Sequence, residues 1–199
     1  QLAVLDCGES GSTLRFLLPV VSALGIDTTI TGHGRLPERP ISPLKEEMER
    51  MGVTFHNGSK FPLHLTGQLQ AGDYEILGNV SSQFISSIII SSPLSKKGVT
   101  LYVLPEFKSK PYVNMTLDIM KKFGVKSLRG YYLKHDGCDK EHQSCRIDEF
   151  KVKKQSYIPC DYTVEGDYSS ASYLLAAIAI NGGHAKVLNL FKNSKQGDK

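Results

Sequence analysis

The sequence predicts an α/β (or α+β) chain built from repeated βαβαββ units, of which about two and a third are present. The first observation is a pattern that occurs three times: an apolar run, a glycine turn and a helix start rich in small polar residues. Its glycines are Gly8, Gly78 and Gly166, which lie 70 and 88 residues apart. The second observation is that strand-like and helix-like segments follow the first two turns in the same order. Together they indicate a structural repeat.

In the first repeat, we expect a helix over residues 12–24, which Pro19 must kink unless the lost N–H is tolerated there. The β-branched segment Ile26–Thr31 is typical of a strand. Apolar residues at helical spacing, with charged residues between them, predict a second helix over residues 41–51. The alternation of Phe61–Thr66 predicts a strand.

The second repeat copies this order. Ser82–Ser92 is expected to be a helix and Val99–Leu104 a strand. Pro111–Phe123 is a predicted helix with proline in its first turn and Gly124 after its end. We expect two or three strands between residues 125 and 154.

The third repeat is partial, with a predicted strand Tyr162–Glu165, a helix Ser169–Ile180 and a strand Ala185–Leu190. These segments suggest two domains. Residues 1–160 are expected to form most of one domain, and residues 161–199 the hinge and the start of a second. The chain begins with Gln1 rather than Met and stops after a loop-like segment, so we expect both ends to be cut.

Composition is that of a soluble globular protein, with 40% apolar and 22% charged residues and a net charge of +4. It excludes intrinsic disorder, and no apolar run, Ile88–Ile90 included, approaches the length needed to span a membrane. Residues 121–160 hold ten Lys and Arg against five Asp and Glu, a net charge of +5. A basic stretch can contact nucleic acid, but acidic residues alternate with the basic ones, which favours a solvated hairpin.

Cysteine and histidine spacing points to no metal site. The cysteines, Cys7, Cys138, Cys145 and Cys160, form no C-x-x-C pair, and the six histidines show no metal or relay spacing. We expect reduced thiols in a cytosolic protein.

The three glycine turns are candidate anion sites. A helix N-terminus presents free backbone N–H groups and the positive end of its dipole, which suits phosphate. For any single turn the alternative is stronger, because Ser, Asp and Asn there are ordinary N-caps. Arg15, Arg35 and Arg39 lie beside these turns, and Lys108 and Lys110 precede a helix. They suit phosphate or carboxylate ligands, and ion pairs such as Arg39 with Glu38 or Glu47 are an equal alternative.

Five segments together resemble the 5-enolpyruvylshikimate-3-phosphate synthase family. They are Asp6–Arg15 (DCGESGSTLR), Arg35–Ile41 (RLPERPI), Gly78–Phe84 (GNVSSQF), Ser109–Tyr112 (SKPY) and Val164–Tyr173 (VEGDYSSASY). The resemblance covers essentially the whole chain. It implies a transferase that moves the enolpyruvyl group of phosphoenolpyruvate to shikimate 3-phosphate in aromatic amino-acid biosynthesis. It also implies an inside-out α/β barrel made from βαβαββ repeats.

Site residues follow from the resemblance, motif by motif. It implies that shikimate 3-phosphate binds Ser81, Ser82, Gln83, Ser109 and Tyr112, and that phosphoenolpyruvate binds Gly11, Arg39 and Gln83. Arg15 is expected to support the first turn. The family implies no cofactor, no metal, no nucleic acid and no membrane, and a cytoplasmic enzyme that is a monomer when complete.

One part of the family pattern is missing and one position differs. The family's acid–base carboxylate lies beyond the end of this chain, so no catalytic residue is assigned and we expect the chain to be inactive alone. Glu9 stands where many relatives have Asn, and it either repels anions or caps the helix. Another enolpyruvyl transferase or same-fold enzyme, and a non-catalytic anion-binding module, remain as alternatives.

Overall fold

The computed structural model describes residues 2–133 and 146–199. The chain divides into two compact units, the first ending at Ile158 and the second formed by Pro159–Lys199. The correspondence of these units to enzyme domains stays a prediction. Residues 134–145, which belong to the basic stretch 121–160 and include Cys138 and Cys145, lie outside the described residues.

The first compact unit begins with a four-stranded sheet in the order β1-β2-β4-β3. Strand β2 pairs in parallel with β1 and antiparallel with β4, which also pairs antiparallel with β3. The strands are β1 (Ala3–Asp6), β2 (Thr28–Thr31), β3 (Val53–Phe55) and β4 (Leu63–Gly67). The helical elements are α1 (Gly11–Leu24), the 3₁₀ helix η1 (Leu36–Glu38) and α2 (Leu44–Arg50).

The second sheet repeats this topology in the order β5-β6-β8-β7. Again the first two strands are parallel and the last two form an antiparallel hairpin. The strands are β5 (Gly72–Leu77), β6 (Gly98–Leu104), β7 (Ser127–Leu133) and β8 (Arg146–Lys153). The helical elements are α3 (Ser82–Ser91), the 3₁₀ helix η2 (Ser92–Leu94) and α4 (Lys110–Lys122). The identical strand order confirms the predicted βαβαββ repeat and the mixed α/β fold class.

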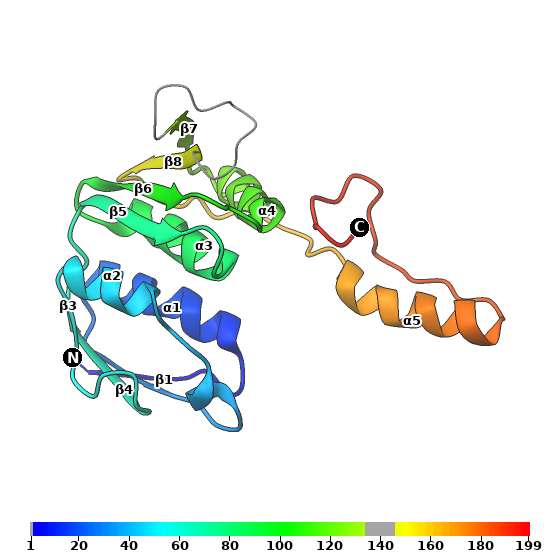
Figure 1. Cartoon of the computed structure of the whole chain (residues 1–199), viewed down its shortest axis with the longest axis horizontal. Helices are drawn as coiled ribbons and strands as arrows, with labels where there is room; N and C mark the ends of the chain where they lie inside the picture. The colour runs from blue at the N-terminus through cyan, green and yellow to red at the C-terminus, as the bar shows by residue number, and fades with distance from the viewer. Residues whose placement is uncertain (1, 134–145) are drawn as a thin grey trace. The chain divides into compact units, whose positions relative to one another are not determined.

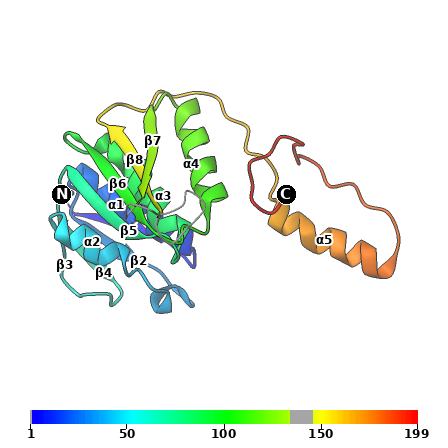
Figure 2. The same cartoon turned by 45° about the horizontal axis from the view of Figure 1, so that its top comes forward.

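The helices of the two repeats share one core. Figure 1 shows α1, α2 and α3 between the two sheets, and α1 packs directly against α3. Leu14 and Leu18 of α1 and Phe84 and Ile88 of α3 are almost fully buried. Figure 2 shows α4 beside β7. The two sheets cover this helical layer from opposite sides. The helices therefore lie inside, and the far face of each sheet lies outside.

A buried carboxylate ties the two repeats together. Glu47 of α2 accepts hydrogen bonds from the Arg50 guanidinium and from the backbone N–H of Glu75 in β5, both at 2.6 Å. The same guanidinium donates to the carbonyl oxygen of Asp73 at 2.6 Å. The alternative pairing of Glu47 with Arg39 is therefore wrong, because Arg50, one helical turn away, binds this carboxylate.

Most predicted elements are confirmed, with two differences in the first repeat. The strand Val53–Phe55 was not expected, because three residues are too few to show an alternation. The predicted second helix begins three residues late, at Leu44, since the segment before it contains Pro40 and Pro43. Helix α1 continues through Pro19 as a single element.

The second compact unit contains α5 (Tyr168–Asn181), but the strands predicted over residues 162–165 and 185–190 are wrong. These two segments lie side by side, joined by hydrogen bonds from the Gly166 N–H to the Asn189 carbonyl oxygen (2.7 Å) and from the Asn189 side chain to Val164 (2.9 Å). Asn189 has φ of 63°, which interrupts a strand. Val164 and Leu188 are mostly exposed, so no buried face stabilises a ladder here.

Two further findings concern the described residues alone. Cys7 is a buried free thiol, and Cys160 is exposed. Within residues 2–133 and 146–199, no helix combines the length and the apolar character that a membrane crossing requires.

Candidate functional site

The three glycine turns all begin helices, but different residues of the motif act as the N-cap. Ser10 caps α1 by accepting from the Thr13 N–H, and Ser81 caps α3 by accepting from the Gln83 N–H. Asp167 caps α5 through the N–H groups of two serines, and the hydrogen bonds from Ser170, the largest cause, lower the pKa of this carboxyl. These caps lie two, three and one residues after the glycine. The capping interpretation of the motif is therefore confirmed for all three turns.

Glu9 is not the cap of helix α1, which was one of the two roles considered for it. Ser10 is the N-cap, and the Glu9 carboxylate lies against Gly34, with its oxygen 3.7 Å from the His33 ring nitrogen. A side chain at Gly34, which has φ of 59°, would collide with this carboxylate. Glu9 therefore packs across the loop before η1, and the helix start does not depend on it.

A pocket of about 450 Å³ lies at the N-terminal turns of α1, α3 and α4. Four of the residues expected to bind shikimate 3-phosphate line it, together with the expected supporting arginine. The complete lining is Ser12, Arg15, Phe16, Ser81, Ser82, Gln83, Ser86, Tyr112, Met115 and Thr116. Three helix N-termini give this pocket a positive potential, and serine and threonine hydroxyls add hydrogen-bond donors. It has the chemistry of an anion site.

The side-chain amide of Gln83 is held from both sides. Its oxygen accepts a hydrogen bond from Arg15 Nη1 at 2.7 Å, and its nitrogen donates to Ser12 Oγ at 2.7 Å. Both partners belong to α1, whereas Gln83 belongs to α3, so the contact joins the two repeats. It fixes which end of the amide is the acceptor and which the donor, and leaves one hydrogen and one lone pair for a ligand.

Arg15 connects this amide with the arginine loop. Its Nη2 donates to the carbonyl oxygen of Pro40 at 2.9 Å, and its guanidinium lies 4.9 Å from the centre of the Phe84 ring. Burial, followed by the positive charge of Arg39, lowers the pKa of Arg15. Its Nε is buried without a hydrogen-bond partner among the residues described. Arg15 therefore holds Gln83 and the loop that carries Arg39, whereas its support of the first turn stays a prediction.

Gly11, Arg39 and Ser109 do not line this pocket. Arg39 lies against Gly11, since a Cβ at Gly11 would be 2.7 Å from Arg39 Nη1. The absence of a side chain at position 11 thus lets the guanidinium reach the start of α1. Ser109 is the residue before α4 and makes no side-chain cap hydrogen bond. The structure places Gly11 with Arg39 as one pair, and the serines with Gln83 and Tyr112 as one pocket.

Lys108 precedes α4 and Lys110 is its first residue, and the two lysines differ in surroundings. Lys108 is exposed, with Glu106 at 4.0 Å. Lys110 is 3.4 Å from the buried carboxylate of Asp148. Each of the two lysines therefore has an acidic partner, as the ion-pair interpretation expects.

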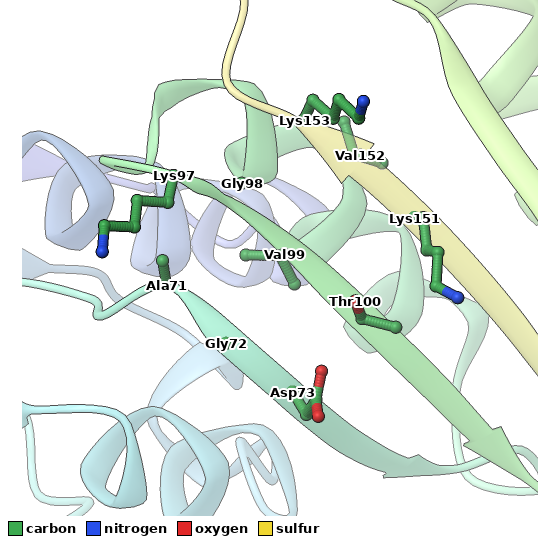
Figure 3. Close-up of a pocket in the computed structure, with 10 residues that line it drawn as sticks. All are labelled: Ala71, Gly72, Asp73, Lys97, Gly98, Val99, Thr100, Lys151, Val152 and Lys153. Carbon is green, nitrogen blue, oxygen red and sulfur yellow. The ribbon is translucent and has the colours of Figure 1, made fainter.

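A second pocket, of about 380 Å³, lies over β5, β6 and β8 (Figure 3). Its lysines, Lys97, Lys151 and Lys153, come from strand residues and the turn before β6. None of the predicted site residues lines it, and Lys151 is already paired with Glu149 at 3.0 Å. We therefore take the pocket among the three helix N-termini as the candidate site.

Sequence reasoning missed five lining residues of the candidate site. They are Ser12, Phe16, Ser86, Met115 and Thr116. Three of them lie four residues after another lining residue in the same helix, at positions 16, 86 and 116, so helical spacing from the motif residues would have found them. As for a metal, the described part of the chain contains no cluster of three His, Cys, Asp or Glu that could hold one.

Comparisons with known proteins point to one family. The family model described as EPSP synthase (3-phosphoshikimate 1-carboxyvinyltransferase) matches residues 1–199. A 3-phosphoshikimate 1-carboxyvinyltransferase of Methanobrevibacter smithii is 56% identical over 98% of this chain and 45% of that protein. The protein of the same name from Methanosphaera stadtmanae is 42% identical with the same coverage. The chain thus spans just under half the length of the curated relatives it matches.

A solved structure of similar fold is the EPSP synthase of Acinetobacter baumannii. It matches 89% of this chain and 36% of its own chain, with a TM-score of 0.62 and 22% sequence identity. This likeness confirms the inside-out α/β fold. With the family model spanning every residue and relatives above 40% identity, the chain belongs to the EPSP synthase (3-phosphoshikimate 1-carboxyvinyltransferase) family.

Proposed function

We propose that this chain supplies part of the substrate site of an enzyme that makes 5-enolpyruvylshikimate 3-phosphate from shikimate 3-phosphate and phosphoenolpyruvate. The observation that carries the proposal is the pocket at three helix N-termini, where Ser81, Ser82, Gln83 and Tyr112 lie together. Family membership and the names of the relatives support the same reaction. In this proposal the first compact unit belongs to one enzyme domain, and Pro159–Lys199 begins the other.

The reaction requires that two anionic substrates lie side by side. A hydroxyl group of shikimate 3-phosphate gives up its proton as its oxygen bonds to the central carbon of phosphoenolpyruvate, while a proton joins the methylene carbon. Loss of phosphate and of one proton from the new methyl group then restores the double bond. Because the charges of both substrates must be held together, fixed donors and helix dipoles stabilise the complex better than mobile water does.

Each residue has a role in the proposal. Ser81, Ser82, Gln83, Ser109 and Tyr112 bind shikimate 3-phosphate. The pair of Gly11 and Arg39 binds phosphoenolpyruvate, and Gln83 contacts both substrates. In this arrangement Arg15 touches neither substrate and acts as a positioning residue for Gln83. We also propose that the complete protein acts as a monomer in the cytoplasm and binds neither nucleic acid nor a membrane.

The variant Gln83→Ala tests this proposal. It removes a donor and an acceptor that face the ligand, so we expect the affinity for shikimate 3-phosphate to fall about tenfold or more. Isothermal titration of the chain with shikimate 3-phosphate measures the change. Lys151→Ala is the matched control, because Lys151 lies in the other pocket and its loss leaves the proposed contacts intact.

The outcome is decisive in either direction. A folded Gln83→Ala chain that binds shikimate 3-phosphate as tightly as the unaltered chain contradicts the proposed site. Equal weakening in Lys151→Ala contradicts it too, because a residue outside the candidate site would then affect binding as much as Gln83 does.

A further inference from the structure

Three cationic side chains converge on one carboxylate at the end of the second sheet. Asp148 of β8 is fully buried. Arg146 binds it with two hydrogen bonds, of 3.0 and 3.2 Å, and Arg129 of β7 with one of 3.1 Å. The Nζ of Lys110, the first residue of α4, lies 3.4 Å from the second carboxylate oxygen. We call these four residues the Asp148 cluster.

Aromatic rings fix each cation in place. The Arg146 guanidinium lies 4.0 Å from the centre of the Tyr131 ring, and that of Arg129 lies 5.2 Å from Phe150. The Lys110 ammonium lies 5.4 Å from Phe107. Arg129 also donates to Asn114 Oδ1 at 2.6 Å. The positive charges are therefore held in position without a ligand, which lowers the entropic cost of binding one.

The charges of the cluster do not balance. Burial acts to raise the pKa of Asp148, but the hydrogen bonds from Arg146 and Arg129 and the charge of Lys110 lower it overall, so the carboxyl is ionised near neutral pH. Three cations and one carboxylate leave a net charge of +2. Within residues 2–133 and 146–199, no second carboxylate pairs with any of the three. The cluster therefore holds more positive charge than its one carboxylate neutralises, and an anion bound there would be attracted by the excess.

The position of the cluster allows a ligand to reach it. The side chains of Lys110, Arg129 and Arg146 keep 28%, 32% and 26% of their surface exposed. Lys110 is also in the first turn of the 13-residue helix α4, where the helix dipole adds a partial positive charge. Two residues later, Tyr112 lines the candidate substrate pocket, yet no member of the cluster does.

We propose that Lys110, Arg129 and Arg146 form an oxyanion site that takes a phosphate group, with Asp148 neutralising part of their charge. The phosphate comes either from free inorganic phosphate or from shikimate 3-phosphate in the adjacent pocket. The first source is independent of the proposed function, and the second rests on it.

The test is a calorimetric titration of the chain with inorganic phosphate at constant ionic strength. We expect Arg146→Gln and Arg129→Gln each to weaken phosphate binding about tenfold, because each removes a charge-assisted donor. Asp148→Asn raises the net charge of the cluster from +2 to +3, so we expect tighter binding, about threefold or more. Lys151→Ala, whose lysine pairs with Glu149, is the matched control and should bind phosphate as the unaltered chain does.

Three outcomes overturn the proposal: no phosphate binding by the unaltered chain, unchanged binding in both arginine variants, or loss of binding in a folded Asp148→Asn chain. Circular dichroism establishes that each variant is folded. Where Asp148→Asn does not fold, the two arginine variants decide alone, since their side chains lie partly in solvent.

Competition identifies the source of the phosphate. If saturating shikimate 3-phosphate displaces inorganic phosphate and Arg146→Gln weakens both, the cluster binds the substrate phosphate. If inorganic phosphate still binds, the cluster is a separate site. Gln83→Ala separates this proposal from the proposed function, because it should weaken shikimate 3-phosphate and leave inorganic phosphate at the cluster unaffected.

Discussion

Arg15→Ala is expected to lower the affinity for shikimate 3-phosphate by about 10- to 100-fold, although in this account Arg15 does not touch that substrate. The substitution removes the hydrogen bonds to Gln83 Oε1 and to the Pro40 carbonyl oxygen. The amide of Gln83 then keeps only its hydrogen bond to Ser12, and the loop that carries Arg39 loses the hydrogen bond from Arg15 to Pro40. Isothermal titration measures the loss. Arg15→Lys keeps the positive charge but lacks the planar guanidinium that can donate to Gln83 and Pro40 together. We therefore expect its affinity for shikimate 3-phosphate to lie between those of Arg15→Ala and the unaltered chain.

A double-mutant cycle distinguishes positioning from direct binding. If Arg15 acts through Gln83, the chain carrying both Arg15→Ala and Gln83→Ala should bind no more weakly than the weaker of the two single variants. Additive losses would show that Arg15 contacts the ligand itself. Lys45→Ala is the control, because Lys45 pairs with Glu49 in α2 and does not line the pocket.

Asp148→Asn is expected to lower the free energy of unfolding by about 2–3 kcal/mol near neutral pH. A fully buried ion pair that loses one partner costs about 3–5 kcal/mol. The cost here is smaller because a quarter to a third of each cationic side chain is exposed to water.

The same carboxyl sets the acid sensitivity of the fold. Its pKa in the folded chain lies below the ordinary value of 3.8, so its contribution to stability is fully present above that value. The contribution is lost as the pH falls through the folded pKa. Urea unfolding between pH 2 and pH 6 should therefore show a loss of stability below about pH 4 that is weaker in Asp148→Asn. Parallel curves for the two chains would contradict this role.

The sequence predicted the repeat because its signals are local. A glycine turn followed by a helix with an apolar stripe depends on neighbouring residues, so Gly8 and Gly78 could be found without knowing the fold. The grouping of Ser81, Ser82, Gln83 and Tyr112 came from family motifs, and the pocket brings these four together. Their roles with substrate stay predictions.

Contacts between distant residues could not be predicted in this way. Gln83 meets Ser12 and Arg15 across 71 and 68 residues, because two repeats pack helix against helix. Arg129 and Asp148 meet through the register of β7 with β8. The strands expected near Val164 and Leu188 failed for a related reason. Their composition favours a strand, but a strand also needs a neighbour to pair with and a face to bury.

Thermal unfolding of the 199-residue chain with and without shikimate 3-phosphate tests the central claim most directly, because a ligand that binds the folded state stabilises it. At a hundredfold excess over the dissociation constant, the stabilisation is about 2.7 kcal/mol. The account predicts a cooperative transition whose midpoint rises with shikimate 3-phosphate and rises less in Gln83→Ala. A cooperative transition that shikimate 3-phosphate leaves unmoved would contradict it.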